Sequence, residues 1–181
     1  MGRVEDDILE VLYTHDEIVS ACKRIAKQIN EDYKDKRPML IGLLKGAVPF
    51  MSELIKHLDG YVEIDFLKAS SYNGTNSTGE VKLINHVFSN IEGKDIIFVE
   101  DIIDTGLTLD VVMKEYMKKG AKSIEVATLL DKAERRAVNT VKPKYIGFDV
   151  PNKFVVGFGL DYNELYRNLP YIGVLKESVY K

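Results

Sequence analysis

The strongest constraint on this chain comes from residues 96–108, which read Ile-Ile-Phe-Val-Glu-Asp-Ile-Ile-Asp-Thr-Gly-Leu-Thr. The run from Ile96 to Val99 is short, apolar and rich in β-branched residues, which is typical of a strand buried on both faces of a sheet. After Gly106, apolar residues recur at helical spacing; they are Leu107, Val111, Val112, Tyr116 and Met117. The segment therefore predicts a strand, an acidic loop and a helix in succession.

The predicted loop carries the residue types that bind a phosphate beside a sugar. Thr105, Gly106 and Thr108 lie where a helix exposes its free N–H groups and the positive end of its dipole, which suits a phosphate. Glu100 and Asp101 would repel an anion unless they accept hydrogen bonds from sugar hydroxyls or help to hold a divalent cation. A ligand with a phosphate, a sugar diol and magnesium meets all these demands.

Length and composition limit the class of protein. The 181 residues favour one domain, or one core with a small appended hood. The net charge of −3 argues against a general nucleic-acid binder. The acidic start, Met1 to Asp7, lacks an apolar signal core, and no apolar stretch is long enough to span a bilayer. A single cysteine, Cys22, forms no internal disulfide, so we expect a cytoplasmic protein.

Strand and helix patterns alternate along the chain. Thr14 and Glu17 form a capping box before a helix whose apolar face includes Cys22, which we interpret as a core residue. Asp131 and Glu134 have the same spacing before a short turn. We expect strands at 38–44, 61–68, 81–88, 123–130, 145–150 and 154–157, and a helix at 47–58. This order favours an α/β fold with a mainly parallel sheet, whose ligands bind beyond the carboxyl ends of the strands.

Residues 99–108 also resemble a known signature. They are similar to the phosphoribosyl-pyrophosphate (PRPP) motif of the type I phosphoribosyltransferases, and the variant Glu-Asp-Ile-Ile-Asp-Thr-Gly resembles the hypoxanthine-guanine branch. The resemblance covers roughly residues 8–181, with five motifs in family order. It implies the type I fold: a central, mainly parallel, twisted sheet flanked by helices. It also implies one domain over 1–181, with a core at about 10–150 and a hood at about 151–181 to which the N-terminal residues are a candidate addition.

Within the signature, the resemblance assigns roles to individual residues. It makes Asp104 the candidate general base at purine N7. It places Glu100 and Asp101 on the ribose diol and its magnesium, and it places the turn from Asp104 to Thr108 (Asp104, Thr105, Gly106, Leu107, Thr108) around the 5′-phosphate. Leu107 is a departure, because some members carry a lysine there. Backbone N–H groups and the threonine hydroxyls remain able to hold the phosphate.

A second motif, Leu43 to Ala47, follows a predicted strand and opens a helix. Taken alone it reads as a plain turn with a solvated lysine, and it lacks the ending of a P-loop. By resemblance, Lys45 and Gly46 form the pyrophosphate loop, with a cis peptide between Leu44 and Lys45. Arg167 would bind pyrophosphate through its planar fork of donors, and Asp161 would hold a second magnesium ion.

The purine-site residues follow from the same resemblance. Lys132 would donate to the 6-oxo oxygen, and Phe154 would stack on the base. The Val155 backbone would read the edge of the base, with the Asp161 backbone nearby. A lysine donor selects 6-oxopurines, because adenine presents a donor of its own at that position. Without the resemblance, Lys132 would be a surface residue and Phe154 and Val155 core residues.

The polar segment 70–79 reads as a loop. An exposed surface loop is one interpretation. The resemblance makes Ser71 and Tyr72 part of a flexible catalytic loop, which would close over an oxocarbenium-like transition state and exclude water. His15, His57 and His86 show no metal-binding spacing with each other or with Cys22.

The resemblance implies a magnesium-dependent enzyme of purine salvage. It would transfer phosphoribosyl from PRPP to N9 of hypoxanthine, and of guanine, and release pyrophosphate with IMP or GMP. The alternatives are a xanthine-preferring relative and a PRPP-binding regulator of nucleic acid with the same fold. The second needs a basic surface or an added domain, and this acidic chain shows no obvious one. We expect a homodimer or homotetramer, with neither nucleic acid nor membrane as a partner.

Overall fold

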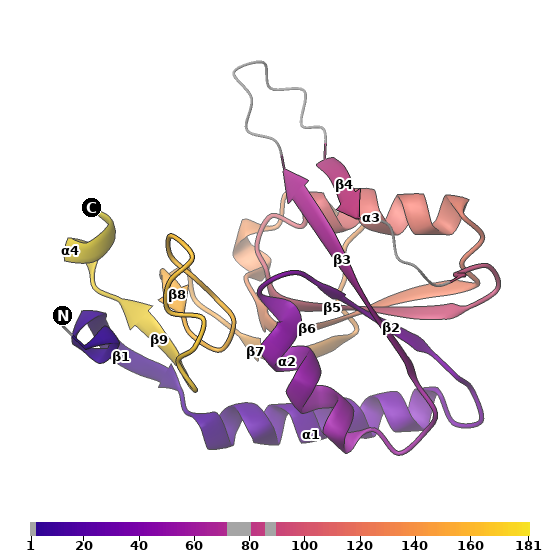
Figure 1. The fold of residues 1–181 in the computed structure, drawn as a ribbon, viewed down its shortest axis with the longest axis horizontal. Coiled ribbons are helices and arrows are strands. Elements are labelled where there is room, and N and C mark those ends of the chain that lie inside the picture. Colours follow the sequence, from indigo (N-terminus) through magenta and orange to yellow (C-terminus); the bar gives the residue numbers. More distant parts are fainter. Residues whose placement is uncertain (1–2, 72–80, 86–89) are drawn as a thin grey trace.

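The computed structural model describes residues 3–71, 81–85 and 90–181, with two sheets and their helices (Figure 1). The larger sheet has the strand order β4-β3-β2-β5-β6-β7 and the smaller one β1-β9-β8. The elements, in chain order, are η1 Val4–Asp7, β1 Ile8–Tyr13, α1 His15–Asp32, β2 Met39–Leu43, α2 Ala47–Leu54, η2 Ile55–His57, β3 Glu63–Ser71, β4 Val81–Asn85, β5 Asp95–Ile103, α3 Leu107–Lys118, β6 Ser123–Asp131, η3 Ala133–Arg135, β7 Tyr145–Asp149, β8 Val155–Val156, β9 Ile172–Leu175 and α4 Glu177–Tyr180.

The larger sheet confirms the predicted α/β class. β3, β2, β5, β6 and β7 run parallel, and β4 joins the edge antiparallel to β3. From β2 the chain builds the sheet in one direction through β3 and β4, then returns to the other side of β2 for β5, β6 and β7. The order therefore reverses between β2 and β5. In such sheets a crevice opens beyond the carboxyl ends of the strands at this switch point.

The apolar run of β5 is buried because helices cover both faces of the sheet. Ile97 and Val99 belong to the core cluster beneath α1 and α2, whereas Ile96 and Phe98 belong to the cluster beneath α3. Since side chains alternate between the faces of a strand, a strand covered on both sides is apolar at nearly every position. The predicted double burial of residues 96–99 is confirmed.

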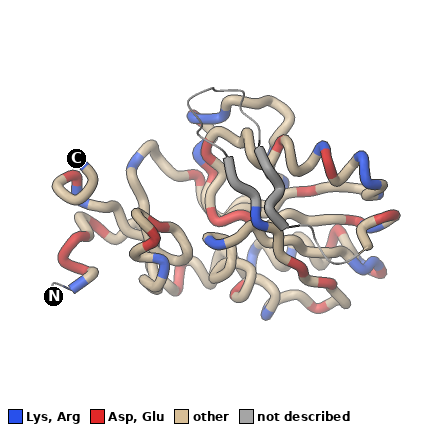
Figure 2. The backbone as a smooth tube through the Cα atoms, turned by 45° about the horizontal axis from the view of Figure 1, so that its top comes forward, with Lys and Arg blue, Asp and Glu red and all other residues tan. Residues whose placement is uncertain are grey.

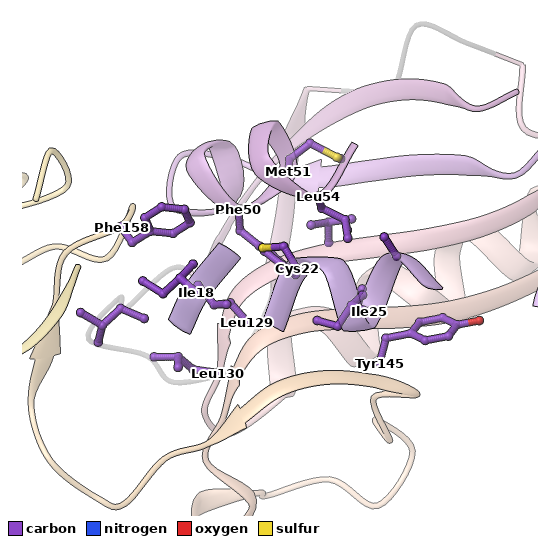
Figure 3. Packing of buried hydrophobic residues seen from close by; sticks show 14 of the residues in the cluster. Ile18, Cys22, Ile25, Phe50, Met51, Leu54, Leu129, Leu130, Tyr145 and Phe158 are labelled. Atoms are coloured by element: carbon purple, nitrogen blue, oxygen red, sulfur yellow. The ribbon is translucent and has the colours of Figure 1, made fainter. Parts of the chain in front are cut away.

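Cys22 lies in the core between α1 and α2. Figure 3 shows it among Ile18, Ile25, Phe50 and Leu54. The side chain is fully buried, and this burial raises the pKa of the thiol to about 12. The interpretation of Cys22 as a packing residue is confirmed, and a buried thiol of this kind is a poor nucleophile.

One predicted capping box forms and the other does not. At α1, the Thr14 hydroxyl accepts from the Glu17 backbone N–H at 3.4 Å, and the Glu17 carboxylate accepts from the Thr14 N–H at 2.8 Å. The box predicted at Asp131 is wrong: in the described structure η3 begins after Lys132 without a side-chain cap. Asp131 ends β6 in a buried position, where its carboxylate pairs with Arg136 instead.

The smaller sheet joins the two ends of the chain. β1 pairs antiparallel with β9, so that Ile8 lies opposite Leu175, and β8 pairs with β9 on its other side. Figure 1 shows this sheet and both termini displaced to one side of the larger sheet. The sequence patterns predicted β8 only approximately, as residues 154–157, and they predicted neither β1 nor β9.

Charge is distributed without long runs of one sign. Figure 2 shows acidic and basic positions interspersed along the backbone, as the sequence indicates. Within the described ranges, no helix combines the length and the apolar character needed to cross a bilayer.

Candidate active site

The two acids of the signature lie within a strand, which corrects the prediction of an acidic loop. β5 continues to Ile103, and Glu100 pairs with Thr128 of β6. β2 pairs with β5 only as far as Val99. Glu100 and Asp101 therefore occupy the part of β5 beyond its pairing with β2, held in place from the β6 side. The physical reason for the longer strand is the continued ladder with β6, which a propensity pattern does not reveal.

A cavity of about 310 Å³ opens at this point. It is lined by the segment that follows β2 and by the end of β5 with its turn into α3; the lining residues are Leu43, Leu44, Gly46 and Glu100–Leu109. The cavity lies at the switch point between β2 and β5, where ligands bind in open α/β sheets. Of the residues predicted to bind PRPP, all seven in the signature line this one cavity.

Two glycines allow close approaches beside the cavity. A Cβ atom on Gly46 would lie 1.7 Å from Oδ2 of Asp101, and a Cβ atom on Gly159 would lie 2.0 Å from the carbonyl oxygen of Gly46. At Gly46 and Gly159 there is therefore no room for a side chain, where the segment after β2 meets the end of β5 and the segment around Gly159. The peptide bond between Leu44 and Lys45 is cis, as predicted.

The local electrostatics favour a cation or hydroxyl donors beside the two acids. Burial, together with the neighbouring Asp101, raises the pKa of Glu100 well above its usual range. Burial also raises the pKa of Asp101 to about 6, although its Oδ1 accepts from the Ile102 N–H at 2.9 Å. Adjacent carboxylates that are costly to ionise gain most from a bound cation.

The carboxylates of Glu100 and Asp101 fit a magnesium ion whose coordination is completed by water and by a bound phosphate ligand. Across residues 3–71, 81–85 and 90–181, no group of three or more His, Cys, Asp and Glu side chains is placed to hold a metal ion. Mg²⁺ is commonly bound by one or two carboxylates, with water and substrate phosphates completing an octahedron. Glu100 and Asp101 match that incomplete set.

The turn into α3 has the geometry expected of an anion site. Gly106, at φ +78°, is the N-cap of α3, and the helix begins at Leu107 as predicted. The Thr105 carbonyl accepts from the Ala137 N–H at 3.0 Å, which fixes the turn from outside. Leu107 is 51% exposed, and its apolar side chain adds no charge to the turn.

Sequence reasoning missed a cation beside this turn. Arg136 packs next to Gly106, with its Nη1 atom 3.3 Å from the position of a Cβ on that glycine. Its guanidinium pairs with Asp131, but Nη1 is buried and has no hydrogen-bond partner among the described residues. The sequence signal was weak, because Arg136 follows β6 and lies thirty positions from Gly106 in the chain.

The predicted pyrophosphate residues are brought together by two acids. Lys45 Nζ lies 2.7 Å from Glu164 Oε2, and Arg167 Nη2 lies 2.7 Å from Asp161 Oδ1 and 3.5 Å from the same Glu164 oxygen. The bond from Lys45 holds the pKa of Glu164 below its usual range. Arg167 also donates through Nη1 to the Gly159 carbonyl at 2.6 Å, while its Nε is buried without a partner among the described residues.

Of the predicted purine residues, Lys132 follows β6, Phe154 lies between β7 and β8, and Val155 begins β8. Lys132 donates its backbone N–H to the Ile103 carbonyl at 3.0 Å, which places it beside Asp104, and its Nζ donates to the Lys153 carbonyl at 2.8 Å. Burial lowers the pKa of Lys132. Phe154 is 38% exposed and stacks on Tyr180, with ring centroids 4.7 Å apart, and Val155 is buried in β8.

The candidate base Asp104 has a partner that the sequence did not reveal. Arg135, from η3, places Nε 2.6 Å from Asp104 Oδ1, and its Nη1 donates to Asn152 Oδ1 at 3.4 Å. This bridge joins the signature turn to the segment that carries Phe154. Asp104 lines the cavity, and its side chain is 42% exposed although its Oδ1 atom is buried.

The predicted catalytic loop falls only partly within the described structure. β3 extends to Ser71, which pairs with Val81 of β4, so the strand is longer than the predicted 61–68. Tyr72 lies outside the described residues.

Comparison with known proteins agrees with this geometry. The profile of the phosphoribosyl transferase domain matches residues 9–163. The hypoxanthine-guanine phosphoribosyltransferases of Streptococcus pyogenes and Streptococcus agalactiae are each 53% identical over 178 residues, which is 98% of this chain and 98% of theirs. A hypoxanthine phosphoribosyltransferase structure from Staphylococcus aureus has a TM-score of 0.94 and 47% identity, covering 100% of this chain and 99% of that one. The chain is therefore a member of the phosphoribosyltransferase family and belongs to its hypoxanthine-guanine branch.

Proposed function

We propose that this enzyme transfers the 5-phosphoribosyl group of PRPP to N9 of hypoxanthine and of guanine, in purine salvage. The C1′–oxygen bond to pyrophosphate breaks, the C1′–N9 bond forms, and the purine loses one proton. The products are IMP or GMP and pyrophosphate. The observation that carries this proposal is one cavity lined by the acid pair of β5, the N-terminus of α3 and Gly46, the residue next to Lys45.

The ribose phosphate is assigned to the signature cavity. The N–H groups at the start of α3, with the hydroxyls of Thr105 and Thr108, would hold the 5′-phosphate. Glu100 and Asp101 would accept hydrogen bonds from the ribose diol. They would also hold Mg²⁺, which would supply positive charge to the departing pyrophosphate when bound, and Asp161 would hold a second ion.

The purine is assigned to the space between Lys132 and Phe154. Lys132 would exchange the Lys153 carbonyl for the 6-oxo oxygen, and Phe154 would stack on the ring beside the Val155 backbone. Asp104 would take the proton from N7 as N9 bonds to C1′, which makes the attacking nitrogen more electron-rich. Because Arg135 pairs with Asp104, that ion pair would loosen as the purine binds.

The remaining assignments concern assembly and location. We propose the small sheet of β1, β8 and β9 as the hood over the purine, within a single domain. We also propose a homodimer or homotetramer located in the cytoplasm. Ser71 and Tyr72 are proposed to belong to the loop that closes over the reacting centre and excludes water.

The test is a set of initial rates with PRPP and Mg²⁺ against hypoxanthine, guanine, xanthine and adenine. We expect turnover of the first two bases and none of adenine. Lys132→Met should lower kcat/KM for both 6-oxopurines by about a hundredfold, because the ammonium donor to the oxo group is lost. Preference for xanthine would overturn the base-site assignment, and binding of PRPP without turnover of any base would overturn the reaction.

A further inference from the structure

We propose that Glu164 competes with pyrophosphate inside the site. In the free enzyme the Glu164 carboxylate occupies Lys45 and Arg167, and it thereby sets the affinity for pyrophosphate and for the pyrophosphoryl end of PRPP. The inference deepens the proposed function, because it takes Lys45 and Arg167 as the pyrophosphate ligands. It assigns Glu164 as a residue that tunes affinity, distinct from the residues that bind the ligand.

The geometry places one carboxylate oxygen between two cations from distant parts of the chain. Glu164 Oε2 is 2.7 Å from Lys45 Nζ and 3.5 Å from Arg167 Nη2. Lys45 follows β2, whereas Arg167 belongs to the segment between β8 and β9. A carboxylate and a phosphoryl oxygen seek the same donors at similar distances. Pyrophosphate cannot bind both cations through these atoms until the Glu164 side chain leaves.

The backbone around Glu164 is built to present the side chain at this point. Asn163 and Glu164 have φ values of +50° and +66°, in the left-handed region that favours glycine. The Glu164 N–H donates to Asp161 Oδ2 at 2.9 Å, and Tyr162 pairs with Leu165 across the turn. The turn is therefore held independently of the ion pair with Lys45.

Arg167 keeps one donor unpaired within the described part of the chain when it binds Glu164, and a phosphoryl anion would use this donor. Its Nη1 and Nη2 atoms are engaged by Gly159 and Asp161, but Nε is buried and has no partner among the described residues. An unpaired buried donor is costly, and an incoming phosphoryl oxygen would satisfy it. The side chain of Glu164 is 64% exposed, so it can swing into water when displaced. An exposed ion pair of this kind is weak enough to yield to a multivalent anion.

The experiment measures the dissociation constant of pyrophosphate with Mg²⁺ by titration calorimetry, for the full chain and three variants. Glu164→Gln removes the charge and should tighten binding about threefold to tenfold. Glu164→Asp keeps the charge but shortens the reach to Lys45, and Asp tolerates the left-handed region, so it should tighten binding nearly as much. The control, Glu177→Gln, removes a similar exposed partner of Lys181 and should leave the constant unchanged.

Each outcome decides between direct competition and its alternatives. If Glu164→Gln leaves pyrophosphate affinity unchanged or weaker, Glu164 is no competitor. If Glu164→Gln tightens binding but Glu164→Asp behaves as the unmodified protein, the negative charge acts by long-range repulsion of pyrophosphate. That result would overturn direct competition through the ion pairs. Failure of the proposed function is distinguishable, because the unmodified protein would then bind no pyrophosphate and turn over no purine.

Discussion

Gly46 lies directly against the carboxylate of Asp101, so close that a Cβ atom on the glycine would sit 1.7 Å from Oδ2. Gly46 has an ordinary right-handed conformation, at φ −62° and ψ −36°, so the chain needs glycine here for space and not for backbone freedom. The contact joins the segment after β2 to the acid pair of β5, and therefore the proposed pyrophosphate side of the cavity to its proposed ribose side.

Gly46→Ala should disable the site while the fold survives. The added methyl group forces Asp101 or the segment after β2 to move, and a misplacement of about 1 Å can reduce the rate by about a hundredfold. We expect kcat/KM to fall by at least that factor and the free energy of unfolding to fall by about 1–3 kcal/mol. Gly60→Ala is the matched control, because a Cβ there meets nothing within 4 Å. Equal activity of the two variants would contradict the importance of this contact.

Asp101→Asn should stabilise the free protein while it weakens PRPP binding. Because the folded pKa of Asp101 is raised from 3.8 to about 6, the folded state binds a proton more tightly than the unfolded state does. The charge therefore destabilises the fold increasingly as the pH rises from about 4 to about 6, and fully above it. Removing it should add about 1–3 kcal/mol at pH 7 and almost nothing near pH 3.

Thermal unfolding at several pH values, with PRPP binding in Mg²⁺, checks this prediction. Asp110→Asn is a useful contrast, because the bond from Lys114 lowers the pKa of Asp110, so that variant should lose stability. If Asp101→Asn lowered the free energy of unfolding at pH 7, the charge of Asp101 would not destabilise the folded protein, and the prediction would be wrong.

Asp104→Asn should reduce turnover much more than PRPP affinity. An amide cannot accept the N7 proton, and general-base catalysis typically contributes about 10²–10⁴-fold. Single-turnover rates with hypoxanthine, compared with PRPP dissociation constants, separate the two effects. Equal losses in rate and affinity would undermine the assignment of Asp104 as the base and would favour a purely structural role in the turn before α3.

Glu53→Gln should destabilise the protein at neutral pH but not in acid. Glu53 is buried on α2, and the bond from Lys56, with that from His57 at 2.9 Å, lowers its pKa below 4.5. A lowered folded pKa means that the carboxylate stabilises the fold above pH 4.5 and that this contribution disappears as the pH falls below it. We expect a loss of about 1 kcal/mol at pH 7, measured by urea unfolding. A constant loss from pH 7 to pH 3 would contradict the ionic origin.

Part of the fold follows from local pattern. The apolar run at 96–99 predicted a doubly buried strand, and Thr14 with Glu17 predicted the start of α1. These signals survive because each depends on neighbours in the chain: burial on both faces, and a cap that closes over three residues. β1 and β9 escaped detection, and their pairing with each other joins residues more than 150 positions apart.

The sequence by itself determined the chemistry: which residues form the signature, that they precede a helix, and that they resemble a phosphoribosyltransferase site. Only the tertiary structure decided which residues the site residues contact. It extended β5 past Glu100 and Asp101, set Arg135 on Asp104, and placed Glu164 between Lys45 and Arg167. The physical reason is the distance along the chain over which each interaction acts. Strand patterns and caps are set by residues a few positions apart, whereas ion pairs across a cavity depend on how the sheet order brings distant loops together.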